Sequence, residues 1–184
     1  MLAALAKRGN LDDVLACLAD ENRARQERAG GVIQQDMNDD LNGNAPIKLD
    51  APALNAFLAR AFPESSEAER GVVERVAPGE AVVRMEPGAR HLRPGGIVSG
   101  PTLMGLTDVA AYAVILAHIG EVAMAVTSAL NYQFLRPCPH EPVRAAASLV
   151  KLGKRQAVVD VRLYVESVTG PIGQAIVTYA IPVG

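Results

Sequence analysis

Residues 100–119 read GPTLMGLTDVAAYAVILAHI, and this stretch decides the fold. Proline suits the first turn of a helix and glycine suits its end, so Pro101 and Gly120 predict one helix over 100–119. The positions between them are apolar nearly all round, and a helix of that kind is buried on most sides. Its single carboxylate is Asp108, two turns into the segment. The sequence therefore predicts a central buried helix that carries an acid.

Strand-like runs lie on both sides of this helix in the sequence. Residues 71–76 and 80–86 predict a β-hairpin around Pro78-Gly79. Four more runs of this kind follow the helix, at 122–135, 142–152, 155–166 and 171–182. This order leaves few crossovers with which to build a parallel sheet, so an α+β fold is favoured over a doubly wound one. We predict a curved antiparallel sheet wrapped around the buried helix.

The first quarter of the chain has a different character. Apolar residues recur at helical spacing within 1–29, whereas 31–48 is polar and has no period. We therefore predict an N-terminal extension over 1–48, a helical arm followed by a flexible segment. The main domain is expected over 49–184, beginning with a short amphipathic helix at 51–62 on which Leu54, Phe57, Leu58 and Phe62 share one face. A helical arm that packs on a partner molecule is the alternative for the extension.

Composition excludes several classes of function. The net charge is −2, which gives no bulk attraction to nucleic acid or to an anionic membrane. The chain has no Trp and only three Phe and four Tyr, so stacking platforms for single-stranded nucleic acid are not expected. Charged residues interrupt the N-terminal stretch, which is not a signal peptide, and no stretch of about 18 uninterrupted apolar residues suggests a membrane span.

The cysteines and histidines suggest neither a disulfide framework nor a metal site. Cys17 and Cys138 are the two cysteines, and a reduced, cytoplasmic chain is the simplest interpretation. His91, His118 and His140 do not have the spacing of metal ligands. His118, in the last turn of the predicted helix, is interpreted as a residue that complements the helix dipole. We expect no metal and no cofactor.

Asp108 is the outlier of the central helix. An unpaired buried carboxylate costs several kcal/mol, so it persists only when it is structurally satisfied or functional. The structural interpretation is an aspartate bonded to Thr107, to Tyr112 or to a neighbouring strand. Taken alone, the residue leaves both interpretations open.

The loop before the helix supports a functional role. Residues 87–98 form a loop rich in Gly, Pro and Arg, and its end runs straight into the helix N-terminus, where unbonded amides and the macrodipole favour negative charge. Pro101 has no N–H, so Gly100 is the best donor for an oxyanion, and Ser99 is placed to cap the helix. The alternative is a glycine-rich turn that does no more than cap the helix.

Spacing decides how the two groups can cooperate. Gly100 and Asp108 are eight residues apart, about 12 Å along a helix at 1.5 Å per residue, so one carbonyl group cannot contact both on the same helix. A two-fold partner with its helix antiparallel would bring Asp108 of one chain near Gly100 of the other. We therefore predict a dimer with two equivalent, shared sites.

Residues 96–110, GIVSGPTLMGLTDVA, resemble the signature of the PaaI-like acyl-CoA thioesterases, in the hotdog superfamily that includes 4-hydroxybenzoyl-CoA thioesterases. In that family a His-Gly-Gly turn precedes a helix that carries Leu-x-Asp. The resemblance implies that Gly100 binds the thioester carbonyl, that Asp108 is the catalytic acid and that Thr127 is a strand hydroxyl near the site. The run NYQFLRP at 131–137 also resembles the family strand that ends in Phe-Leu-Arg-Pro.

The resemblance covers roughly 50–182, with three departures. Ser99 replaces the usual His, which removes a helper but not the nucleophile. Arg93 stands where many relatives carry Asn, which removes an orienting group and offers a contact for a substrate carboxylate or phosphate. Pro101 replaces the second Gly of the turn.

The mechanism implied by the resemblance uses two chains. The Gly100 amide polarises the carbonyl, while Asp108 of the other chain acts as general base on water or attacks directly, and Thr127 orients the water or the acid. The acyl chain is placed near Met104 and Tyr112. The basic residues considered for the CoA phosphates are Arg136, Lys151, Lys154 and Arg155, and the alternative is that they simply face solvent.

Hydrolysis of acyl-CoA thioesters by a homodimer or homotetramer is thus the leading hypothesis. A non-catalytic hotdog protein that binds acyl-CoA is the alternative, and a structural module assembled through its N-terminal arm is a third. Ser99 lies in Gly-x-x-Ser-Gly, so a nucleophile elbow is not supported. Asp160 is expected on the outer face of its strand.

Overall fold

The computed structural model describes residues 46–182. The predicted helical arm and nearly all of the polar segment after it lie outside the described residues. Within them, six strands form one antiparallel sheet in the order β1-β2-β6-β7-β8-β5. Their bounds are β1 Val72–Ala77, β2 Glu80–Met85, β5 Val126–Phe134, β6 Val143–Leu152, β7 Gln156–Tyr164 and β8 Gly173–Ala180.

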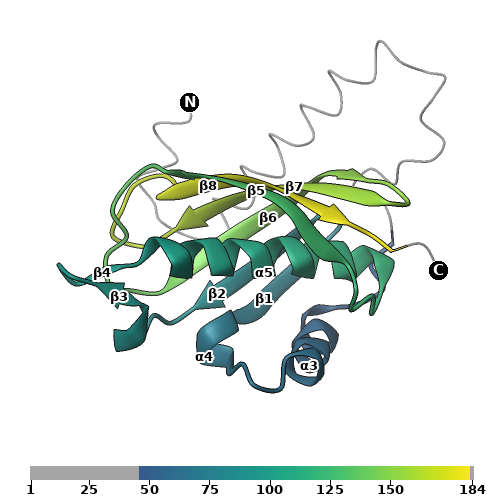
Figure 1. The fold of residues 1–184 in the computed structure, drawn as a ribbon, viewed down its shortest axis with the longest axis horizontal. Coiled ribbons are helices and arrows are strands. Elements are labelled where there is room, and N and C mark those ends of the chain that lie inside the picture. Colours follow the sequence, from purple (N-terminus) through teal and green to yellow (C-terminus); the bar gives the residue numbers. More distant parts are fainter. Residues whose placement is uncertain (1–45, 183–184) are drawn as a thin grey trace, which may run out of the picture. The chain divides into compact units, whose positions relative to one another are not determined.

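One long helix, α5 (Gly100–Ile119), lies against one face of this sheet (Figure 1). The sheet curves around the helix, which confirms the predicted α+β hotdog architecture. The helix bounds are also those predicted, because its ends have strong local signals. The Ser99 hydroxyl caps the N-terminus by accepting from the Thr102 N–H, and Gly120, at φ 93°, ends the helix in a conformation that favours glycine.

The centre of α5 lies in the hydrophobic core. Residues 110–117 are all buried, and the strand residues that face them alternate with residues on the outer face. On β7, Ala157, Val159, Val161 and Leu163 are fully buried. Within the described residues, α5 is also the one helix long and apolar enough to cross a membrane, but 67% of that stretch is buried inside the protein. It is the core helix of this domain.

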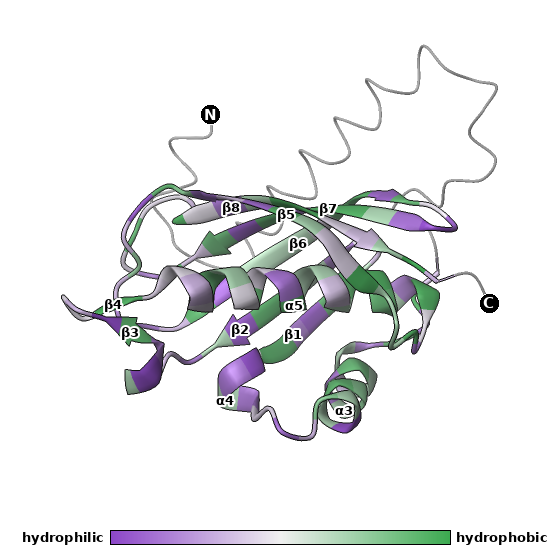
Figure 2. Cartoon of the chain, in the orientation of Figure 1, coloured by the Kyte–Doolittle hydropathy of each residue, from purple (hydrophilic) through white to green (hydrophobic). Residues whose placement is uncertain are grey.

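The outer face of the sheet carries polar groups, as the alternation in Figure 2 suggests. Asp160 belongs to this face, which agrees with its position between inward-facing neighbours. It is nevertheless only 8% exposed, because Gln174 donates to its carboxylate at 3.1 Å and Arg162 pairs with it at 3.4 Å. Its role is accounted for by these contacts within the outer face.

Smaller elements differ from the predictions. Helix α3 spans Ala51–Ala61, so Phe62 is its C-cap and not its last residue. Phe62 is 46% exposed but lines a cavity together with Leu58. The helix α4 (Glu67–Arg70) was not predicted; it is a hydrophilic turn beside α5 that the Ser66 capping box begins (Figure 2). The predicted loop at 87–98 contains a 3-10 turn, η1 (Ala89–His91), and a two-strand ribbon, β3 (Leu92–Arg93) with β4 (Ile97–Val98).

His118 does not have the predicted role. Its side chain is 2% exposed, and its Nε2 accepts the Gly79 N–H at 3.0 Å. An accepting ring nitrogen carries no proton, so the neutral imidazole fits this bond and a dipole-complementing cation does not. His118 instead ties the end of α5 to the turn between β1 and β2.

Gly173 is required where β8 passes Tyr132 of β5. A Cβ added at Gly173 would lie 1.9 Å from the Tyr132 hydroxyl oxygen and 2.5 Å from the ring carbon Cζ. Gly173→Ala is therefore expected to lower the free energy of unfolding by about 1–3 kcal/mol through overpacking. Urea denaturation measures this, and the loss should be smaller when the same change is made in a Tyr132→Ala protein. An equal loss in both backgrounds would contradict the steric explanation.

Candidate active site

Asp108 is held by two hydroxyl groups from the sheet. Thr127 Oγ1 donates to Asp108 Oδ1 at 2.5 Å, and the Tyr179 hydroxyl donates to the same oxygen at 2.8 Å. Thr107 and Tyr112 bond elsewhere, to the carbonyl oxygens of Leu103 and Ala123. The partners of the acid therefore come from the neighbouring strands β5 and β8.

The carboxylate is not enclosed within one chain. Asp108 is of intermediate exposure, whereas the sequence places it among apolar residues on a helix expected to be buried. The difference arises because one face of α5 is not covered by the sheet. Pro101, Met104 and Gly105 are exposed on that face, one and two turns before the acid. Both hydrogen bonds to its side chain end on Oδ1, so Oδ2 has no hydrogen-bond partner among residues 46–182.

A β-bulge gives Thr127 its direction. The pairing of β5 with β8 shifts between Thr127 and Ala129. Because successive strand residues point to opposite faces, residues three apart would normally lie on different faces. The extra residue lets Thr127 reach the helix while Leu130 also packs against the core. Because of the bulge, β5 presents the Thr127 hydroxyl to Asp108 and the Leu130 side chain to the core.

Tyr179 is a site residue that the sequence did not reveal. It is 3% exposed, it pairs with Thr127 in the β5–β8 ladder, and its ring stacks on Tyr112 at 5.8 Å between centroids. Burial, and then the nearby charge of Asp108, raise the pKa of Tyr179 far above its ordinary value. The phenol is therefore protonated at neutral pH and can donate to the carboxylate.

A cavity of about 370 Å³ opens beside the acid. Its apolar lining includes Leu58, Phe62, Val109, Tyr112, Ala123 and Ala125, and its polar lining includes Asp108, Thr127, Tyr179, Ser65 and Arg70. Such a volume, mostly apolar with a few polar groups gathered together, is typical of a small-molecule site. The predicted acyl contact Tyr112 lies in it, while Met104 lies on the exposed face of α5 and lines neither this cavity nor the one at Gly100.

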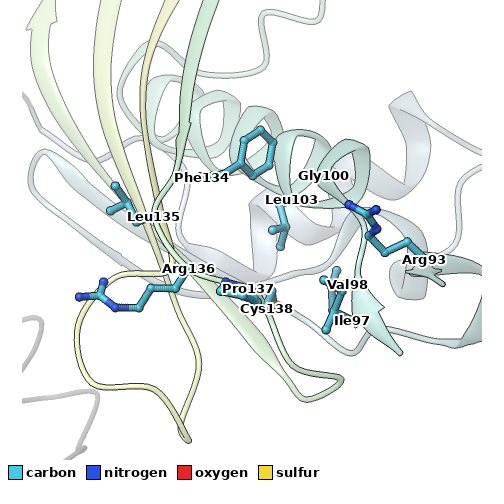
Figure 3. Close-up of a pocket in the computed structure, with 10 residues that line it drawn as sticks. All are labelled: Arg93, Ile97, Val98, Gly100, Leu103, Phe134, Leu135, Arg136, Pro137 and Cys138. Carbon is cyan, nitrogen blue, oxygen red and sulfur yellow. The ribbon is translucent and has the colours of Figure 1, made fainter. Parts of the chain in front are cut away.

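A second cavity, of about 360 Å³, lies at the N-terminus of α5 (Figure 3). Gly100 lines it, and the Phe134 ring packs so closely that a Cβ on Gly100 would lie 3.1 Å from it. Arg93 and Arg136 also line it, on opposite sides in Figure 3. Arg136 already donates to the Pro171 carbonyl at 2.5 Å. One chain thus keeps Gly100 and Asp108 in separate cavities, in line with their spacing on the helix.

The other predicted contacts divide by position. Ser99 caps α5, and its hydroxyl lies 2.9 Å from that of Thr102, so it serves the helix end. Lys154 and Arg155 lie exposed in the β6–β7 turn, at the far end of the sheet from Gly100, and line neither cavity. The structure of one chain therefore gives no support to their predicted contact with the CoA phosphates, which stays a prediction.

The surroundings of Cys138, the cysteine within residues 46–182, do not favour a nucleophilic thiolate. Cys138 lines the cavity at Gly100, but it is buried, and burial raises the pKa of its thiol to about 11. The nucleophilic thiolate is therefore scarce at neutral pH. Residues 46–182 contain no cluster of three or more His, Cys, Asp or Glu side chains able to hold a metal ion.

Comparison with known proteins gives the family. The family model described as the thioesterase superfamily matches residues 95–172. A solved structure from Silicibacter sp. TM1040, provisionally named a thioesterase, is 36% identical, with a TM-score of 0.69 over 76% of this chain and 96% of that one. A mutant form of the phenylacetic acid degradation protein PaaI from Thermus thermophilus is 30% identical, with a TM-score of 0.56 over 63% and 96% of the two chains.

A curated relative from Thermoplasma acidophilum, provisionally named an esterase, is 29% identical over 89 residues, which are 48% of this chain and 67% of that protein. The family match begins in the loop before Gly100 and includes all of α5 with Asp108. The similarity to the Silicibacter structure extends over nearly all of that protein. From these matches and the sheet wrapped around α5, the chain belongs to the thioesterase superfamily, as a PaaI-like protein with the hotdog fold.

Proposed function

We propose that this protein hydrolyses acyl-CoA thioesters to the free acid and CoA, in the cytoplasm, with Asp108 as general base or nucleophile. Its family supports hydrolysis of acyl thioesters in general. The observation that carries the proposal is the Asp108 carboxylate beside a mostly apolar cavity. Two hydroxyls fix its Oδ1, while its Oδ2 has no hydrogen-bond partner within the described part of the chain. CoA is proposed as the thiol carrier because the resemblance at 96–110 is to acyl-CoA thioesterases.

The reaction follows from the groups present. In the general-base route, Asp108 Oδ2 takes a proton from water as the water oxygen bonds to the thioester carbon. The carbonyl electron pair moves onto oxygen, where the Gly100 N–H of a second copy stabilises it. The C–S bond then breaks, and the sulfur leaves as thiolate and receives the proton. In the nucleophilic route, Oδ2 itself bonds to the carbon and the C–S bond breaks, so that CoA leaves as thiolate. Water then hydrolyses the resulting anhydride, which releases the acid, restores the Asp108 carboxylate and supplies the proton that the thiolate takes up.

The proposed active form is a homodimer, which can pair again as a homotetramer. Two surfaces that no other element of residues 46–182 covers support it. The β5 strand is at the edge of the sheet, with Val126 52% and Phe134 57% exposed, and an unpaired edge is a template for a second strand. The uncovered face of α5 lies beside it. Pairing two copies about a two-fold axis would cover both and place Gly100 of one chain near Asp108 of the other.

A thiol-release assay tests the proposed function directly. Wild-type protein is expected to release one free CoA thiol for each acid formed from at least part of a panel of aryl, short-chain and medium-chain acyl-CoAs. Binding of these thioesters without thiol release from any of them would favour the non-catalytic acyl-CoA-binding alternative, which the replacement of the family His and Asn by Ser99 and Arg93 keeps open.

Tyr179→Phe is expected to lower kcat about tenfold with little change in KM. The substitution keeps the ring stacked on Tyr112 but removes one hydrogen bond to a charged oxygen, a bond worth roughly 1.5–3 kcal/mol. Tyr164→Phe is the matched control, because it also removes a tyrosine hydroxyl but at a residue that lines neither cavity. Equal kcat values for the two variants would contradict the role of Tyr179 in positioning Asp108.

A further inference from the structure

The cavity beside Asp108 contains a buried cation that the proposed chemistry does not use. Arg70, the last residue of α4, is 9% exposed and lines this cavity. Its Nη1 donates to the Ser65 carbonyl, and its buried Nε has no hydrogen-bond partner among the described residues. The ion pairs found within residues 46–182 do not include Arg70, although most other arginines of this part of the chain form one.

A buried guanidinium such as that of Arg70 is stabilised by a negatively charged partner. Arginine stays protonated in proteins, so Arg70 cannot lose its charge to suit its surroundings. A buried charge without a counter-ion is costly by several kcal/mol. The acid next to it in the sequence is already engaged, because Glu69 bonds to Ser66 and pairs with Arg90 at 2.8 Å. Glu67, the other acid of α4, also forms no ion pair with Arg70 among those found within residues 46–182.

The position of Arg70 relative to the acid indicates which molecule brings the anion. Arg70 and Asp108 line the same cavity but form no ion pair with each other, and the remaining lining is mostly apolar. If the thioester carbon lies at Asp108, as proposed above, the acyl group is the part of the substrate that enters this cavity. An acyl group in this cavity can then bring a second polar end to Arg70, which lines the cavity together with Ser65.

We propose that the substrates are CoA monothioesters of dicarboxylic acids, with the free carboxylate bound by Arg70. This inference rests on the proposed function and deepens it. A carboxylate fits because the planar guanidinium offers parallel N–H groups that match its two oxygens. The apolar residues Val109, Tyr112 and Ala123 suit the methylene chain between the two ends.

The test compares acyl groups of equal chain length with and without the terminal charge. Values of kcat/KM are measured for glutaryl-CoA against pentanoyl-CoA and for adipoyl-CoA against hexanoyl-CoA. The wild-type protein is expected to prefer the charged member of at least one pair by roughly ten- to a hundredfold, the range of a charge-assisted hydrogen-bonded pair. Arg70→Met should abolish this preference while hydrolysis of the neutral thioesters continues.

Two further variants serve as controls, one for an unstable Arg70→Met protein and one for the loss of an arginine elsewhere. Arg70→Lys keeps the charge but not the planar fork, so it should retain a reduced preference even if Arg70→Met proves unstable. Arg60→Met is the matched control, because Arg60 is exposed, pairs with Glu121 and does not line the cavity. It should leave the preference unchanged. Thermal unfolding of each variant shows whether it is folded.

The outcomes separate this inference from the proposed function. Hydrolysis of neutral thioesters as fast as of charged ones, or an equal loss on both in Arg70→Met, would overturn the role of Arg70 and leave the thioesterase proposal standing. Failure to hydrolyse any thioester would overturn the proposed function. In that case, the affinities for glutaryl-CoA and pentanoyl-CoA, measured by calorimetry, still decide whether Arg70 binds the carboxylate.

Discussion

Asp108→Asn is expected to lower kcat for thioester hydrolysis by about 10²–10⁴-fold while the protein still folds and binds substrate. Asparagine has nearly the same shape, and its side-chain oxygen can accept the hydroxyls of Thr127 and Tyr179 as the carboxylate oxygen does. What it loses is the basic, nucleophilic Oδ2. The measurement is thiol release at saturating substrate, together with the thermal midpoint of unfolding.

Asp160→Asn is the control for this experiment. Asp160 is the acid on the outer face of β7, bonded to Gln174 and paired with Arg162, away from both cavities. The same chemical change there should leave kcat unaltered. A folded Asp108→Asn protein with wild-type kcat would show that the carboxylate has a structural role. Its hydrogen bonds with the hydroxyls of Thr127 and Tyr179 would then explain why an acid is tolerated there.

Local signals explain what could be predicted from the sequence. The bounds of α5 follow from Ser99, Pro101 and Gly120, each of which acts within its own turn of the chain, and the buried centre follows from composition. The apolar runs predict the strands, although β5 begins at Val126, after a turn over residues 120–125, and not at 122. The distance between Gly100 and Asp108 was predictable because helix geometry fixes it.

Contacts that depend on strand order could not be predicted in the same way. Tyr179 reaches Asp108 because β8 lies next to β5, and strands separated by two others in sequence give no local sign of that pairing. Arg70 belongs to a four-residue helix whose position beside α5 is set by tertiary packing. Lys154 and Arg155 were grouped with Arg136 as charges near strand ends, but the topology puts them at the opposite end of the sheet.

Gly100→Pro is expected to reduce kcat by about 10²–10³-fold, the effect of removing one oxyanion donor. The substitution deletes the proposed N–H and little else, because proline is accepted in the first turn of a helix and Ser99 already has the extended conformation that precedes proline. Gly100→Ala is the matched control. It adds the same Cβ near the Phe134 ring but keeps the N–H, so its loss should be much smaller.

Mixing the two inactive proteins then tests whether the site is shared. An Asp108→Asn chain keeps its Gly100 amide, and a Gly100→Pro chain keeps its acid. If each site takes one group from each chain, a mixed dimer contains one intact site and one doubly damaged site. After random exchange between equal amounts of the two chains, half of the dimers are mixed, and each mixed dimer has one intact site of its two. About a quarter of wild-type activity should therefore return. No return of activity despite proven subunit exchange would mean that the acid and the donor act from the same chain. The two groups are about 12 Å apart along one helix, so a single thioester carbonyl could not contact both in that case.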